Sequence, residues 1–86
     1  MMDRAEILAV VMKHVRANVH LPDGGVIDPS RSLVEQGVSS LDAVEIAFGA
    51  AKEVRLRMST AETTRLRSVD QLVDLLLAKT GGVAPR

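Results

Sequence analysis

The sequence contains no cysteine, no tryptophan and no tyrosine, and Phe48 is its one aromatic residue. The lack of cysteine excludes a disulfide framework, a thiolate zinc site and a cysteine nucleophile. With so few aromatic side chains, the core has to be built from Leu, Val, Ile, Met and Ala, a composition that suits packed helices. Since 86 residues can enclose one modest core, we expect a single domain over residues 1–86.

The chain also lacks an excess of charge, because 11 Lys and Arg balance 11 Asp and Glu. A nucleic-acid partner is therefore not expected, since no net positive charge is available to neutralise phosphates. No apolar run is long enough to span a bilayer, and Asp3 and Glu6 stand where a secretory signal would need positive residues. We expect a cytoplasmic protein without a membrane partner.

Groups that catalyse reactions or bind metals are sparse. His14 and His20 have no carboxylate or second histidine at the spacing of a metal site or a catalytic triad, and both are interpreted as ordinary surface or packing residues. Asp42 and Glu45 lie three residues apart, but they have no neighbouring histidine or metal-ligand cluster and are interpreted as solvated carboxylates. The sequence therefore predicts neither an enzyme nor a metal site.

The first helix is predicted over about residues 4–19, where Asp3 and Glu6 have the spacing of a capping box and apolar residues recur every four positions. From Leu21 to Ser39 no period is sustained, so a long loop is expected, with a tight turn at Asp28-Pro29-Ser30. The residues expected to pin this loop to the core are Val26, Ile27, Leu33, Val34 and Val38.

A second helix is predicted over about residues 40–54, with one apolar line formed by Leu41, Val44, Phe48 and Ala51. Further apolar residues widen this line to more than half of the helix circumference: Ile46, Ala47 and Ala50. A central helix with this pattern either has neighbours on several sides or offers part of its apolar surface to a ligand or partner. Gly49, which lowers helix propensity, indicates a close helix contact.

Two further helices complete the prediction. Residues 54–58 alternate apolar and basic side chains and are expected to form an extended connection. A short third helix over about 60–65 follows the capping pair Ser59 and Glu62, and a fourth helix follows Ser68 and Gln71. The predicted fold is an all-α four-helix bundle with a short third helix, an ordered core of about residues 4–80 and a frayed tail over 81–86.

The serine pair between the long loop and the second helix has two compatible interpretations. In the structural one, Ser39 caps the helix and forms a capping box with Asp42. In the functional one, Ser39 still caps, whereas Ser40 faces outward and is covalently modified. The first turn of a helix favours an attached phosphoryl group, because its N–H groups are unpaired and its dipole is positive there.

The residues around Ser40 resemble the phosphopantetheine attachment site of acyl carrier proteins. The stretch reads Gly37-Val38-Ser39-Ser40-Leu41-Asp42-Ala43-Val44-Glu45-Ile46, and the run Arg67–Leu76 is similar to the last helix of that family. The resemblance covers about residues 4–79 and implies a four-helix carrier fold with Ser40 as the attachment serine. One position departs, since Ser39 replaces the usual Asp.

The resemblance implies a set of partners and roles. A phosphopantetheinyl transferase would attach 4'-phosphopantetheine to Ser40, and the thiol of the arm would carry intermediates as thioesters. Loading and processing enzymes, such as an acyltransferase, a ketosynthase or an adenylating enzyme, would bind a surface formed by Leu41, Asp42, Val44 and Glu45. Met58 and Leu66 would lie near an acyl pocket, although both also fit plain core positions. The family favours a monomer.

Charge bears on the pathway. Carriers of general fatty-acid biosynthesis are strongly acidic, whereas this chain is neutral and has basic residues at the end of the second helix and around the third: Lys52, Arg55, Arg57, Arg65 and Arg67. We therefore expect a specialised carrier of polyketide or hybrid polyketide–peptide biosynthesis. Two alternatives stay open, an aminoacyl or peptidyl carrier and an unmodified four-helix interaction module.

Overall fold

The computed structural model describes residues 2–19 and 25–80. In this part of the chain every regular element is a helix, as predicted, and none of these helices is long and apolar enough to cross a bilayer. The elements are α1 (Arg4–Asn18), the 3₁₀ helix η2 (Val34–Gln36), α2 (Ser40–Glu53), α3 (Thr60–Arg65) and α4 (Val69–Lys79). His20 and the predicted frayed tail lie outside the described residues.

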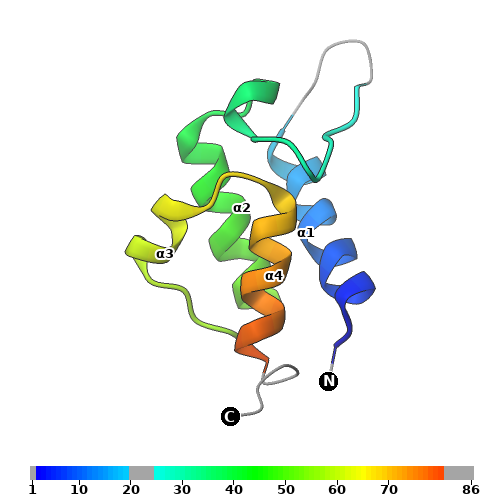
Figure 1. Cartoon of the computed structure of the whole chain (residues 1–86), viewed down its shortest axis with the longest axis vertical. Coiled ribbons are helices and arrows are strands. Elements are labelled where there is room, and N and C mark those ends of the chain that lie inside the picture. Colours follow the sequence, from blue (N-terminus) through cyan, green and yellow to red (C-terminus); the bar gives the residue numbers. More distant parts are fainter. Residues whose placement is uncertain (1, 20–24, 81–86) are drawn as a thin grey trace.

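The helices form a small bundle in which α1 is the shared neighbour of two others (Figure 1). α1 runs antiparallel to α2 and α4 and packs against both, whereas the short α3 contacts α2. The predicted capping boxes are complete at the starts of α1 and α3. At the start of α4, Ser68 caps as predicted, but the Gln71 side chain accepts from the Arg67 N–H at 2.7 Å instead of completing the box. These local signals explain why the predicted helix limits agree with the structure to within a residue or two.

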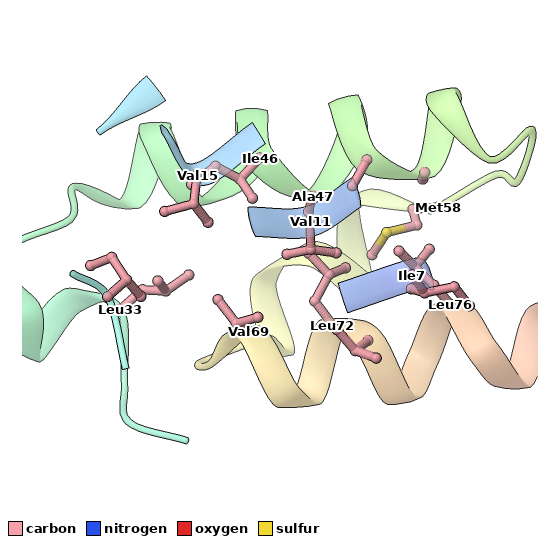
Figure 2. Close-up of a cluster of buried hydrophobic side chains, with 14 of the residues drawn as sticks. Ile7, Val11, Val15, Leu33, Ile46, Ala47, Met58, Val69, Leu72 and Leu76 are labelled. Atoms are coloured by element: carbon pink, nitrogen blue, oxygen red, sulfur yellow. The ribbon is translucent and has the colours of Figure 1, made fainter. Parts of the chain in front are cut away.

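The core is aliphatic and lies between α1, α2 and α4 (Figure 2). α1 contributes Ile7, Val11 and Val15, which follow one another every four residues and are at most 3% exposed. α4 presents four buried residues with helical spacing toward them: Val69, Leu72, Val73 and Leu76. Removal of these aliphatic side chains from water is the main stabilising contribution to the fold.

The buried face of α2 differs from the predicted apolar line. Its buried residues are Ile46, Ala47, Ala50 and Ala51. Two members of the predicted line are exposed instead, Leu41 by 68% and Phe48 by 39%. Alanine side chains allow neighbouring helices to come close, so three alanines and Ile46 of α2 face the bundle, whereas Leu41 and Phe48 are left outside.

The long connection before α2 is held in place by backbone hydrogen bonds to the start of α4. The Leu33 N–H donates to the Arg67 carbonyl at 2.7 Å, and the Asp70 N–H donates to the Pro29 carbonyl at 2.9 Å. Of the five residues expected to pin the loop, three are buried, Ile27, Leu33 and Val38, whereas Val26 and Val34 are 81% and 60% exposed.

Val34 begins η2, a 3₁₀ helix that the sequence did not predict, and in this helix it is Gln36 that contacts the rest of the loop. The Gln36 amide accepts from the Asp28 N–H at 2.7 Å and donates to the carbonyls of Asp28 and Arg31 at 3.0 and 3.1 Å. Gly37 ends η2 with φ of 94°, a left-handed conformation that favours glycine. The half-buried side-chain amide of Gln36 therefore connects η2 to residues 28–31 of the loop.

Gly49 marks a close contact between α1 and α2, as predicted. A Cβ atom at this position would lie 2.7 Å from Nδ1 and 3.0 Å from Cε1 of His14. The ring of His14 is held there, since its Nε2 lies 2.8 Å from Glu53 Oε1, while Lys13 Nζ lies 2.5 Å from Glu53 Oε2. His14 is thus a packing residue. Its partner Glu53 is 39 residues away in the sequence, so the local spacing of residues could not reveal it.

This contact predicts a change of sign in the effect of an alanine at Gly49. In the native chain, Gly49→Ala forces the His14 ring off Glu53 and should lower the free energy of unfolding by about 1 kcal/mol. In a His14→Ala background the same substitution should raise it by about 0.5–1 kcal/mol, because alanine is the better helix former. Urea unfolding of the four chains measures both effects, and equal effects in the two backgrounds would contradict the contact.

The Glu53 cluster predicts a pH-dependent contribution to stability. A hydrogen bond from Lys13, and to a smaller extent one from His14, holds the pKa of Glu53 below its ordinary value of 4.5. The ionised carboxylate therefore stabilises the fold above that value, and this contribution is lost as the pH falls through the folded-state pKa. Glu53→Gln should unfold at lower urea concentration than the native chain at neutral pH, with the difference shrinking as the pH falls below 4.5.

Glu45→Gln serves as the control for this measurement, because Glu45 is an exposed carboxylate of the same helix with no ion pair among the described residues. A pH-independent gap between Glu53→Gln and the native chain would show that the cluster does not act through the charge of Glu53.

Candidate functional site

The serine pair at the start of α2 divides into one residue that caps the helix and one that does not. Ser39 Oγ accepts a hydrogen bond from the Asp42 N–H at 3.1 Å, and the Ser39 carbonyl accepts one from the Ala43 N–H at 3.0 Å. The predicted capping box is only half formed, because no bond from the Ser39 N–H to the Asp42 carboxylate is found in the described residues. In both complete boxes, at α1 and α3, a glutamate makes this return bond, and aspartate is one methylene shorter.

Ser40 is the first helical residue of α2, and its side chain is exposed. The Ser40 hydroxyl makes no hydrogen bond to the described residues, so no hydrogen bond among them would be lost if this hydroxyl were modified. The N–H groups of Ser40 and Leu41 precede the hydrogen bonds that begin the helix, and the helix dipole is positive at this end. The arrangement therefore offers a free hydroxyl beside unpaired amide donors.

A pocket of about 260 Å³ adjoins Ser40. Three segments that are distant in sequence form it: η2, the first turn of α2, and α3 with the residue that follows it. Its lining residues are Val34, Ser40, Ala43, Val44, Thr63, Thr64 and Leu66. None of them carries an ionisable side chain, so the pocket offers apolar surface and hydroxyl groups.

The two threonines of the pocket already use their hydroxyl protons. Thr63 Oγ1 donates to the Thr60 carbonyl at 2.7 Å, and Thr64 Oγ1 donates to the Ala61 carbonyl at 2.9 Å. Val44 and Leu66 are half-buried. Among the hydroxyl groups of the pocket, only that of Ser40 donates to none of the described residues. It lies next to the aliphatic part of the pocket.

The structure brings together some of the residues singled out in the sequence and separates others. Ser40, Val44 and Leu66 share the pocket, but Met58 does not, since it is 9% exposed in the core and borders a different groove. Leu41 is 68% exposed beside the pocket and does not line it. Asp42 is partly exposed and Glu45 exposed, so these carboxylates are accessible to partners.

Four residues of the pocket are absent from the sequence-based site: Val34, Ala43, Thr63 and Thr64. The pocket depends on how the loop before α2 folds against α3, and no local pattern reports that arrangement. The described residues contain no group of three His, Cys, Asp or Glu side chains placed to hold a metal ion.

The division of roles between the two serines predicts different effects on stability. Ser39→Ala removes the cap of α2 and should lower the free energy of unfolding by about 1 kcal/mol. Ser40→Ala removes a hydroxyl without a described partner and should change it by less than about 0.5 kcal/mol. Urea unfolding followed by circular dichroism compares the two, and an equal loss in both variants would contradict this assignment.

Comparison with known proteins yields no match, whether with family models, with curated proteins or with solved structures.

Proposed function

We propose that this chain is an acyl carrier protein whose Ser40 hydroxyl bears 4'-phosphopantetheine. The observation that carries the proposal is that Ser40 is exposed at the start of α2 and its hydroxyl bonds to none of the described residues, while its neighbour Ser39 caps the helix. The Ser39 Oγ already accepts the capping hydrogen bond from the Asp42 N–H, whereas Ser40 can be modified without breaking any described contact. The resemblance around Ser40 in the sequence points to the same residue.

The start of α2 suits a phosphodiester. The N–H groups of Ser40 and Leu41 can donate to its oxygens, and the positive end of the dipole favours its charge. The group would supply a thiol that holds intermediates as thioesters, a function that the chain itself lacks because it contains no cysteine.

Attachment requires no catalytic residue from this chain. In the active site of a phosphopantetheinyl transferase, the Ser40 hydroxyl loses its proton to a base of the transferase. Ser40 Oγ then attacks the phosphorus that bears the pantetheine arm of coenzyme A. A P–O bond forms as the phosphoanhydride bond of coenzyme A breaks, and adenosine 3',5'-bisphosphate leaves.

The neighbouring pocket and surface support the later steps of a carrier. Val44 and Leu66 offer apolar surface beside the attachment point, where an acyl group can be shielded from water. Leu41 and Glu45 are exposed on the same helix and are available to loading and processing enzymes. Because the chain has no net charge, recognition depends more on shape and apolar contact than on long-range attraction, which favours a dedicated polyketide-type pathway.

The proposal predicts that Ser40 alone accepts the group. Intact mass is measured after incubation of the native chain with coenzyme A, magnesium and a broad-specificity phosphopantetheinyl transferase. We expect a gain of one phosphopantetheine in the native chain and in Ser39→Ala, and none in Ser40→Ala. Circular dichroism of each variant shows that it is folded, so a missing gain reports the loss of the hydroxyl.

No gain with several transferases on a folded native chain would overturn the proposal and favour an unmodified interaction module. If the group is gained, a panel of acyl and aminoacyl donors with their loading enzymes separates an acyl carrier from an aminoacyl or peptidyl carrier.

A further inference from the structure

A second surface feature lies at the opposite end of α2 from Ser40. It is a shallow groove of about 490 Å³, here called the basic groove, and its lining residues are Phe48, Ala51, Lys52, Arg55, Leu56, Arg57 and Met58. Ser40 and Lys52 are twelve residues apart, so they are separated by about 18 Å along the helix. The basic groove is therefore distinct from the pocket beside Ser40.

The floor of the basic groove is apolar. Phe48, the one aromatic residue of the chain, is 39% exposed there, so the core contains no aromatic side chain. Leu56 is half-buried and Met58 is buried, and both line the groove. Partly exposed aromatic side chains with methionine and leucine around them are typical of protein–protein contact surfaces.

The rim of the basic groove is cationic and lacks ion pairs among the described residues. Lys52, Arg55 and Arg57 are all exposed, and no acidic side chain lines the groove. The adjacent carboxylate, that of Glu53, is bonded to Lys13 and His14 of α1. Three positive charges therefore face solvent together at one end of a chain whose net charge is zero.

Local structure explains only part of this cluster. Lys52 in the last turn of α2 interacts favourably with the negative end of the helix dipole. Arg55 follows the helix with φ of 62°, a conformation in which glycine or asparagine is less strained than arginine. Arg57 belongs to the extended connection and caps nothing. The backbone thus gives no reason for arginine at positions 55 and 57.

We propose that the basic groove binds an acidic amphipathic segment of a partner protein. Apolar side chains of the segment pack on Phe48 and Leu56, and its carboxylates pair with Lys52, Arg55 and Arg57. The planar guanidinium groups suit carboxylates, with which they form paired hydrogen bonds. Three cations around a narrow apolar floor match a peptide better than a membrane, which requires a broad amphipathic face.

The test uses the unmodified chain, because the proposal does not depend on the modification of Ser40. The probe is a synthetic helical peptide with leucines on one face and glutamates on the flanking positions, titrated into the ¹⁵N-labelled chain and followed by NMR. We expect shift changes concentrated in residues 48–58 and binding that weakens as salt is added. A peptide of the same composition in scrambled order should bind at least about ten-fold more weakly, because its apolar face is lost.

Two charge-reversed triple variants make the test specific. Lys52→Glu with Arg55→Glu and Arg57→Glu should weaken binding at least about ten-fold. A triple variant of three other exposed arginines, Arg16, Arg31 and Arg65, to glutamate changes the net charge equally and should alter binding by less than about two-fold. Circular dichroism verifies that both variants are folded.

Equal losses in the two triple variants would overturn the proposal, because attraction would then be unspecific. The proposal would also be overturned if the peptide did not bind. Shifts in residues 48–58 on adding vesicles of phosphatidylglycerol and phosphatidylcholine would then identify the groove as a membrane surface instead. Phe48→Ser adds an independent check, since loss of the apolar contact should weaken peptide binding several-fold while the rim charges are intact.

Discussion

The candidate site depends on how the long connection between α1 and α2 is fixed. Two backbone hydrogen bonds, from Leu33 to Arg67 and from Asp70 to Pro29, tie this connection to the start of α4. Inside the loop, the Gln36 amide accepts from the Asp28 N–H and donates to the carbonyls of Asp28 and Arg31. Because residues 28–36 of the connection are fixed in this way, η2 and the start of α2 are held beside α3, where together they line the pocket at Ser40.

The distribution of side-chain size along α2 has a second consequence. The alanines of α2 face the bundle and allow α1 to approach so closely that Gly49 touches the His14 ring. The large side chains Leu41 and Phe48 are left on the outside, at opposite ends of the helix. The close approach of α1 and α2 therefore goes together with exposed apolar side chains at both ends of α2: Leu41 beside Ser40 and Phe48 in the basic groove.

Much of the fold could be predicted because its signals are local. Asp3 with Glu6 and Ser59 with Glu62 form complete capping boxes, so the starts of α1 and α3 follow from a few adjacent residues. The buried face of α2 could not be derived in this way, because its apolar residues cover more than half of the helix and only the neighbours decide which are buried. The pocket at Ser40 and the partnership of His14 with Glu53 depend on contacts between distant segments, which periodicity does not report.

The two ends of α2 favour negative groups for different physical reasons. At the N-terminal end the attraction comes from unpaired amide groups and the positive end of the dipole, which act only within the first turn. At the C-terminal end the dipole is negative, and the attraction comes from the side chains of Lys52, Arg55 and Arg57 at the surface. A partner that held the basic groove through an acidic segment would leave Ser40 accessible about 18 Å away along a rigid helix. Binding there would raise the effective concentration of the partner's active site near Ser40 without competing for the serine itself, so the two surfaces can act together while each is tested separately.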